Sequence, residues 1–372
     1  MSRFDRYLLS QLMVLFGFFA LVLVSVYWVN RAVVLFDQLI ADGQSASVFL
    51  EFTALSLPNV IRRVLPMSAF AAAVYVTNRL SSESELVVMQ ATGFSPWRLA
   101  RPVFYFGVSV ALMMAVIMHF LVPSSLSRMS ERQKEIAENT TARLLTEGTF
   151  LHPSSGVTFY IREITPNGTL KDVFLSDRRQ EDQVVTYTAS KAYLVKSDDG
   201  PKLIMVDGLS QIHATDTDSL FTTNFSDFTY DIGALLNSGA DEGVNLRHLS
   251  TIALLTDSEA IAKEVGVGRG WVMEEAHDRM NQPLMCLVAA LIGFATLLTG
   301  GYSRFGVWRQ IVTAFVLLVV VEMIKNGVSD PVRDNAANWP LMYLPSVVGL
   351  CLTAALLWLS AHPIRLRKRV ET

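Results

Sequence analysis

Five basic residues interrupt or border long apolar segments of this 372-residue chain, and their chemistry suits the binding of phosphate groups. A charged side chain at bilayer depth is costly, so its presence favours a function. Guanidinium groups can bind phosphate oxygens through two parallel hydrogen bonds, and an ammonium group adds a point charge. The set favours an anionic, multiply phosphorylated lipid as ligand. The candidates are Arg31, Arg62, Arg63, Arg279 and Lys325.

Each of these cations also has an ordinary explanation. Long basic side chains reach out of the apolar layer to common phospholipid headgroups. Lys325 could simply pair with Glu322, one helical turn earlier. These alternatives apply to single residues, whereas the phosphate site is an interpretation of the set.

A second group of candidate residues lies between Leu80 and Gly93. Ser82 followed by Glu85 and an apolar run is a capping-box pattern, which predicts a short helix at about 81–93 that stops at Gly93. The helix is more apolar than a solvated surface helix needs to be, so one face is expected to dock on a partner. The expected contacts are Glu83, Glu85, Leu86 and Met89. The alternative for Glu85 is a capping role alone.

The sequence gives no sign of an enzyme. It contains no GxxxxGK[ST], HExxH or GxSxG motif, and its six histidines are scattered. Cys286 and Cys351 both lie in apolar runs, which predicts neither a metal site nor a disulfide. The 31 basic and 34 acidic residues nearly cancel, so no nucleic-acid partner is expected. If nucleotide energy is used, another chain must bind the nucleotide.

The elements that would position these residues are membrane helices. Hydrophobic residues make up 51% of the chain and charged residues only 17%, and about 20 apolar residues of helix cross a bilayer. Four segments of that length carry no charged residue. Two further uncharged runs are shorter because charged residues border them. The six predicted spans are 7–30, 64–78, 102–127, 280–303, 310–321 and 335–364.

Basic residues near the span ends predict the orientation, because Lys and Arg are retained on the cytoplasmic side. All four basic clusters fall on one side of a six-span chain. They are Arg3 with Arg6; Arg79, Arg98 and Arg101; Arg304 with Arg309; and Arg365, Arg367, Lys368 and Arg369. Both termini are therefore predicted to be cytoplasmic. The same threading places the five candidate cations at one level, in the outer half of the membrane, with Lys325 ending the fifth span.

The segment between the third and fourth spans predicts a periplasmic β-domain. Short stretches alternate apolar and polar residues, as in a half-buried antiparallel sheet. Helices are expected near 127–141 and 257–279, and the strands between them predict a sandwich or open barrel. Expected strands lie at 157–161, 173–175, 184–187, 193–195, 203–206 and 228–232. The predicted organisation is 1–124 with spans one to three, 125–278 as the β-domain with flanking helices, and 279–372 with spans four to six and a basic tail.

Several of these segments resemble a known family, the LptF/LptG permeases of the lipopolysaccharide export ABC transporter. The most specific is Arg79 to Phe94, and Leu65 to Ser68, Lys171 to Leu175 and Lys325 to Gly327 support it. The resemblance extends over nearly the whole chain. The Asp-Val-Phe-Leu and Lys-Asn-Gly stretches favour the LptF branch.

The resemblance implies more than the residues themselves predict. It implies an α+β protein of the bacterial inner membrane, with six helices and a periplasmic β-jellyroll. It also implies a heterodimer with an LptG-like permease on an LptB-like ATPase dimer, which holds the ATP and Mg²⁺, and delivery of lipopolysaccharide to LptC-like and LptA-like proteins. Glu85 resembles the glutamate of the family's coupling helix, and Arg31 resembles a basic position that faces lipid phosphates.

If the β-domain holds acyl chains, its apolar strand residues would form the groove, although an ordinary sheet core is the simpler explanation for each of them. The groove candidates are Val157, Phe159, Ile161, Phe228 and Tyr230. Two other classes of protein remain open. One is a permease of another lipid or lipoprotein ABC exporter, and the other is a membrane-anchored periplasmic assembly factor without transport. Binding of an ATPase subunit and the identity of the bound lipid would separate them.

Overall fold

The computed structural model describes residues 2–41, 45–143, 147–154, 156–180, 182–197, 200–215, 218–231, 245–300 and 307–362. The chain divides into two compact units, a helical unit of Met1–Met129 with Val244–Thr372 and a β-unit of Ser130–Gly243. The basic clusters at Arg304 and at 365–369, and Ile232 of the last predicted strand, lie outside the described residues.

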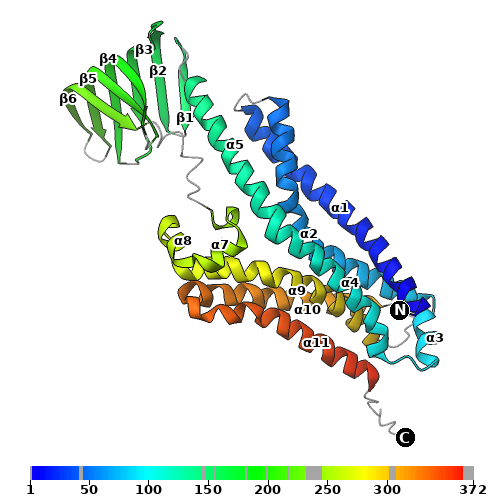
Figure 1. Ribbon diagram of the computed structural model, residues 1–372. Coiled ribbons are helices and arrows are strands. Elements are labelled where there is room, and N and C mark those ends of the chain that lie inside the picture. The colour runs from blue at the N-terminus through cyan, green and yellow to red at the C-terminus, as the bar shows by residue number, and fades with distance from the viewer. Residues whose placement is uncertain are drawn as a thin grey trace. The chain divides into compact units, whose positions relative to one another are not determined.

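The six predicted spans are confirmed as helices long and apolar enough to cross a membrane. They are α1 (Arg3–Ala41), α2 (Ala46–Ser82), α4 (Pro96–Val116) continued through a π-helical turn (Ile117–Leu121) into α5 (Val122–Arg143), α9 (Arg269–Thr299), α10 (Trp308–Asp334), and a 3-10 segment (Ala336–Tyr343) continued into α11 (Leu344–Ala361). Helix α9 is central, because it packs against α2, α4, α10 and α11 (Figure 1). Its apolar residues are accordingly buried all round, as expected of a helix enclosed by others.

The fifth span is longer than its uncharged run. Helix α10 continues to Asp334, so the prediction that Lys325 ends this span is wrong. Charged residues do not stop the helix because two of them are neutralised by α9. Lys325 Nζ lies 3.1 Å from Asp278 Oδ1, and Arg333 Nη2 lies 3.1 Å from Glu274 Oε1.

The helix predicted at 257–279 is broken in two. Helix α8 (Ser258–Val265) ends at Gly266, whose φ of +74° is the left-handed conformation common after a helix. Helix α9 then begins at Arg269, and the short α7 (Thr251–Thr256) precedes α8. These segments pack on α9 and belong to the helical unit.

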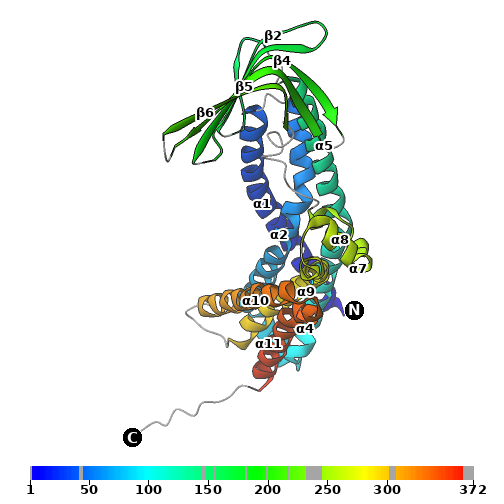
Figure 2. The same ribbon diagram turned by 90° about the vertical axis from the view of Figure 1, so that its left-hand side faces the viewer.

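The β-unit contains six antiparallel strands in sequence order: β1 (Phe150–Ser154), β2 (Val157–Ile164), β3 (Thr169–Asp177), β4 (Gln183–Ser197), β5 (Gly200–Ala214) and β6 (Ser219–Asp231). Figure 2 shows the strong twist of this sheet. Within the described residues, consecutive strands pair throughout, which is an up-and-down order. Gly168, at φ +78°, lies in the turn between β2 and β3.

Sequence alternation mispredicted β4, because a line of irregular residues crosses the sheet. Leu170 and Val173 of β3 are both buried although they are three residues apart, and Asp172 between them has a φ of +47°. Asp207 of β5 has a φ of +54° at the same level, opposite Ser190 of β4. The core face therefore changes from one residue parity to the other along β3 and β4, where Leu170 and Val173, and Ala189 and Ala192, are buried. The two strands predicted at 184–187 and 193–195 are one strand, since the change in periodicity marks this line and not a strand end.

Candidate functional site

The short helix α3 (Glu85–Ala91) lies between α2 and α4, but its start differs from the prediction. The capping box of Ser82 and Glu85 is wrong, because Ser82 is the last residue of α2 and its hydroxyl donates to the Arg79 carbonyl. The residue before α3 is Ser84, at φ +61°. Gly93, at φ +91°, follows the helix where a stop was predicted.

One hydrogen bond joins α3 to α1, and two ion pairs lie at the same predicted cytoplasmic end, one at the end of α2 just before α3 and one between α1 and α4. The Tyr7 hydroxyl of α1 donates to Glu85 Oε1 over 3.5 Å, and Arg79 of α2 pairs with Glu83 over 2.9 Å. Asp5 of α1 is fully buried and accepts two hydrogen bonds from the Arg98 guanidinium of α4, at 2.8 and 3.1 Å. A force applied to α3 would therefore reach α1 directly and α4 through the Asp5–Arg98 pair.

The four expected coupling residues do not share one face. Leu86 is 5% exposed and packs in the helical core, and Met89 packs against that core. Glu83 is exposed and Glu85 is half-buried. The exposed apolar residues of α3 are instead Val87 and Val88, at 45% and 58%. The sequence does not show which of the four consecutive apolar residues 86–89 are buried and which are exposed, because all of them belong to one apolar run.

The opposite, predicted periplasmic end of the helices holds a network of ions on α9. Arg279 is 1% exposed and its guanidinium donates to Glu275 at 2.9 Å, to the carbonyls of Leu249 and Leu246 at 2.8 and 3.0 Å, and to Thr251 Oγ1 at 3.4 Å. The Arg279 guanidinium is thus already hydrogen-bonded to four groups of the same chain. The carbonyl contacts fix the segment before α7 on α9.

Arg62 is the buried candidate cation whose charge is least balanced by neighbouring groups. It is 9% exposed, and its Nε has no hydrogen-bond partner among the described residues. The charges acting on it come from Arg247, Glu275, Arg63 and Asp278. Glu275 is already engaged by Arg279, and Asp278 by Lys325. Positive charge is therefore in excess around Arg62.

The structure brings Arg62, Arg279 and Lys325 into one region, together with Arg63 beside Arg62, and shows no contact between Arg31 and this group in the described residues. Arg63 is exposed, and Arg31 is a half-buried residue of α1 without an ion-pair partner in the described part of the chain. The sequence reading missed the acidic members of the network, Glu274, Glu275 and Asp278. The available signal was that Glu275 and Asp278 lie four residues and one residue before Arg279, because residues three apart place both carboxylates on one helix face.

The groove candidates of the β-unit fall into two groups. Val157, Phe159 and Ile161 are at most 5% exposed and pack in the sheet core. Phe228 and Tyr230 are half-buried on β6, where the Phe228 ring stacks on Tyr187 with 4.9 Å between centroids. The Tyr230 hydroxyl donates to Asp177 Oδ2 over 3.0 Å, and hydrogen bonds from Arg179 and Tyr230 hold the pKa of the Asp177 carboxyl below its usual value.

Comparison with known proteins agrees with this arrangement. Residues 6–359 match the family described as lipopolysaccharide export system permease LptF/LptG. An uncharacterized protein of Rickettsia prowazekii is 21% identical over 87% of this chain and 89% of its own length. Escherichia coli K12 LptF is 25% identical over 60% of this chain and 61% of its own length. Haemophilus influenzae LptG is 26% identical over 36% of this chain and 37% of its own.

The family match covers most of the chain, including all six spans in part or in full and the inserted sheet. A permease of this family is a multi-pass protein of the inner membrane and a transport subunit without a nucleotide-binding site of its own. The chain therefore belongs to the LptF/LptG family of lipopolysaccharide export system permeases.

Proposed function

We propose that this chain is the LptF-type half of a permease pair that withdraws lipopolysaccharide from the outer leaflet of the inner membrane. Its other half would be an LptG-like permease, and an LptB-like ATPase dimer would supply the energy. LptC-like and LptA-like proteins would receive the lipid in the periplasm. The LptF assignment rests on the longer alignment with LptF, 60% of the chain against 36% with H. influenzae LptG.

The packing of α3 on the helical core through Leu86 and Met89, with its hydrogen bond to α1, is the observation that carries the coupling mechanism. Closure of the ATPase dimer would push on α3, the Tyr7–Glu85 contact would pass the movement to α1, and the Asp5–Arg98 pair would pass it on to α4. The cavity between the two permeases would then narrow and move the lipid outward. Exposed Val87 and Val88 would lie against the ATPase, with Glu85 as the acidic contact, while Leu86 and Met89 keep α3 on the bundle.

Replacing Glu85 with alanine tests this coupling. We expect the complex to assemble and hydrolyse ATP, but lipid release per ATP hydrolysed to fall at least about tenfold, since loss of one charge from a docking pair costs about 2 kcal/mol or more. The measurement is lipopolysaccharide release from proteoliposomes alongside phosphate production. Glu131→Ala, an acidic residue of α5 far along the chain from α3, is the control. Normal release per ATP by Glu85→Ala would contradict the coupling role.

We propose that Arg62, with Arg31 and Arg63, contacts the lipid phosphates. The excess positive charge around Arg62 supports this, because a buried guanidinium without a direct counter-ion is expensive unless an anion approaches it. Arg279 and Lys325 would hold the network in place through Glu275 and Asp278. Acyl chains would enter the β-unit beside Phe228 and Tyr230, because the other groove candidates are already packed.

Arg62→Gln is therefore expected to reduce the amount of lipopolysaccharide that co-purifies with the complex by about tenfold, the loss of charge-assisted hydrogen bonds to phosphate. Photo-crosslinking of lipid to the complex measures the same step without detergent washing. Arg269→Gln serves as the control, since Arg269 forms an exposed ion pair with Glu259. Equal crosslinking by the two variants would rule out a phosphate contact at Arg62.

A further inference from the structure

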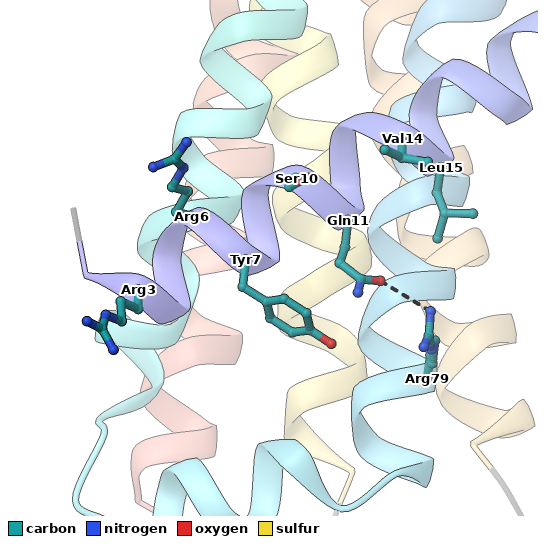
Figure 3. Close-up of a pocket in the computed structure, with 8 residues that line it drawn as sticks. All are labelled: Arg3, Arg6, Tyr7, Ser10, Gln11, Val14, Leu15 and Arg79. Atoms are coloured by element: carbon teal, nitrogen blue, oxygen red, sulfur yellow. Dashed lines mark hydrogen bonds between the residues drawn. The ribbon is translucent and has the colours of Figure 1, made fainter.

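A pocket of about 590 Å³ lies at the predicted cytoplasmic end of the helices, between the first four turns of α1 and the last turn of α2 (Figure 3). Arg3 and Arg6 line it at the start of α1, and Arg79 of α2 lines it at the other end. Tyr7 and Gln11 lie between these cations in Figure 3. Tyr7 and Arg79 also form the contacts to Glu85 and Glu83 described above, whereas Arg3 and Arg6 have no part in the transport mechanism.

The pocket is strongly cationic, because three arginines and no acidic residue line it. Arg79 donates to Glu83 and to Gln11 Oε1, over 2.9 and 3.2 Å. Arg3 and Arg6 are exposed and form no ion pair within the described part of the chain. Asp5, the acidic residue between them, does not line the pocket and is bound by Arg98. The Arg3 and Arg6 guanidinium groups therefore have donors free for anions at this end of the pocket, and Figure 3 shows that they extend to different sides of α1.

The residues that line the pocket change along α1 from cationic to polar to apolar, which is the order of phosphate, glycerol and acyl chain in a lipid. Hydroxyl and amide groups of Tyr7, Ser10 and Gln11 follow the cations, and Val14 and Leu15 come next, one turn further into the membrane. Val14 is 68% exposed, so the apolar end of the pocket is open to acyl chains. A phosphate at the arginines, a glycerol at the hydroxyls and an acyl chain along Val14 would match this order.

We propose that this pocket binds the phosphate headgroup of an anionic glycerophospholipid from the cytoplasmic leaflet. Basic pockets between membrane helices on the cytoplasmic side are suited to such headgroups, because Arg binds phosphate through paired hydrogen bonds while the chains stay in the bilayer. The pocket is at the opposite end of the helices from Arg31 and Arg62, so its ligand is distinct from a lipid exported from the outer leaflet. The inference depends on the membrane orientation and not on the identity of the transported lipid.

Native mass spectrometry of the full transporter complex, reconstituted in membranes of phosphatidylcholine with phosphatidylglycerol, tests the proposal. The unsubstituted complex is expected to retain phosphatidylglycerol selectively. Arg3→Gln with Arg6→Gln should reduce that retention at least about tenfold through lost charge-assisted hydrogen bonds. Ser10→Phe should reduce it as well, by filling the pocket while every charge stays in place. Arg101→Gln is the matched control, because Arg101 is an exposed arginine at the same end of α4 and does not line the pocket.

Loss of lipid in the double variant and in Ser10→Phe, with retention in Arg101→Gln, would support the pocket. Retention in all variants would overturn it. Loss in the double variant with full retention in Ser10→Phe would indicate diffuse attraction to basic residues, and would also overturn it. Displacement of the lipid by millimolar inorganic phosphate would identify a soluble anion as ligand. Retention by this chain alone, but not by the complex, would mean that a partner protein covers the pocket.

Discussion

Replacement of Arg279 by methionine is expected to destabilise the helical unit by about 3–5 kcal/mol, the cost of removing one partner from a buried ion pair. The Arg279 guanidinium is 1% exposed, and the shorter, uncharged side chain of methionine cannot donate a hydrogen bond. The carbonyls of Leu246 and Leu249 would lose their donors. Glu275, whose side chain is 15% exposed, would keep only Arg247 at 3.8 Å.

The measurement is the thermal melting of the detergent-solubilised complex, followed by size-exclusion chromatography. Arg247→Met is the matched control, because Arg247 approaches the same Glu275 but its side chain is 50% exposed, and we expect a loss of under about 1 kcal/mol. A variant Arg279→Met that melts like the unsubstituted protein, yet binds less lipopolysaccharide, would reverse our assignment. Arg279 would then be a ligand-binding residue and not a positioning residue.

Replacement of Gly270 by valine should be the most damaging change that adds only apolar atoms. A Cβ at this position would lie 2.1 Å from the Arg333 carbonyl oxygen and 2.5 Å from that of Val332. Backbone atoms cannot move aside as a side chain can, so the start of α9 and the end of α10 must separate. Separation would also break the Arg333–Glu274 pair and the stacking of Arg333 over Trp271, at 4.2 Å from the ring centroid. Overpacking costs about 1–3 kcal/mol, and we expect at least the upper end of that range.

Gly268→Val is the control, two residues away on the same segment. The nearest atom to a Cβ at Gly268 is Trp271 Cδ1 at 3.8 Å, an ordinary contact, and the φ of −66° suits any residue. The melting temperature of Gly268→Val should therefore stay close to that of the unsubstituted complex, and that of Gly270→Val should fall clearly below it. Similar melting temperatures for the two variants would show that α9 and α10 do not approach closely at Gly270.

The positions of the membrane helices could be predicted from the sequence because the signal is local. A span requires an apolar run of sufficient length, and each run can be read without knowing its neighbours. The same holds for the insertion of an antiparallel sheet between the third and fourth spans, although β1 was not predicted and β4 was predicted as two strands. The line of irregular residues that crosses the sheet could not be predicted from the sequence. Asp172 and Asp207 adopt positive φ values in mid-strand, and only the paired strands show that the two residues lie at one level of the sheet.

The sequence by itself determined the membrane class, the number of spans, the presence of basic residues within them and the family resemblance at Arg79 to Phe94. The tertiary structure decided which of those basic residues are already neutralised. Lys325 and Arg279 find carboxylates on α9, whereas Arg62 is left with excess positive charge. The physical reason is that hydropathy depends on composition along the chain, whereas ion pairing depends on how each helix is rotated and on which neighbour it faces. Single-sequence periodicity does not specify that rotation when a helix such as α9 is apolar on every side.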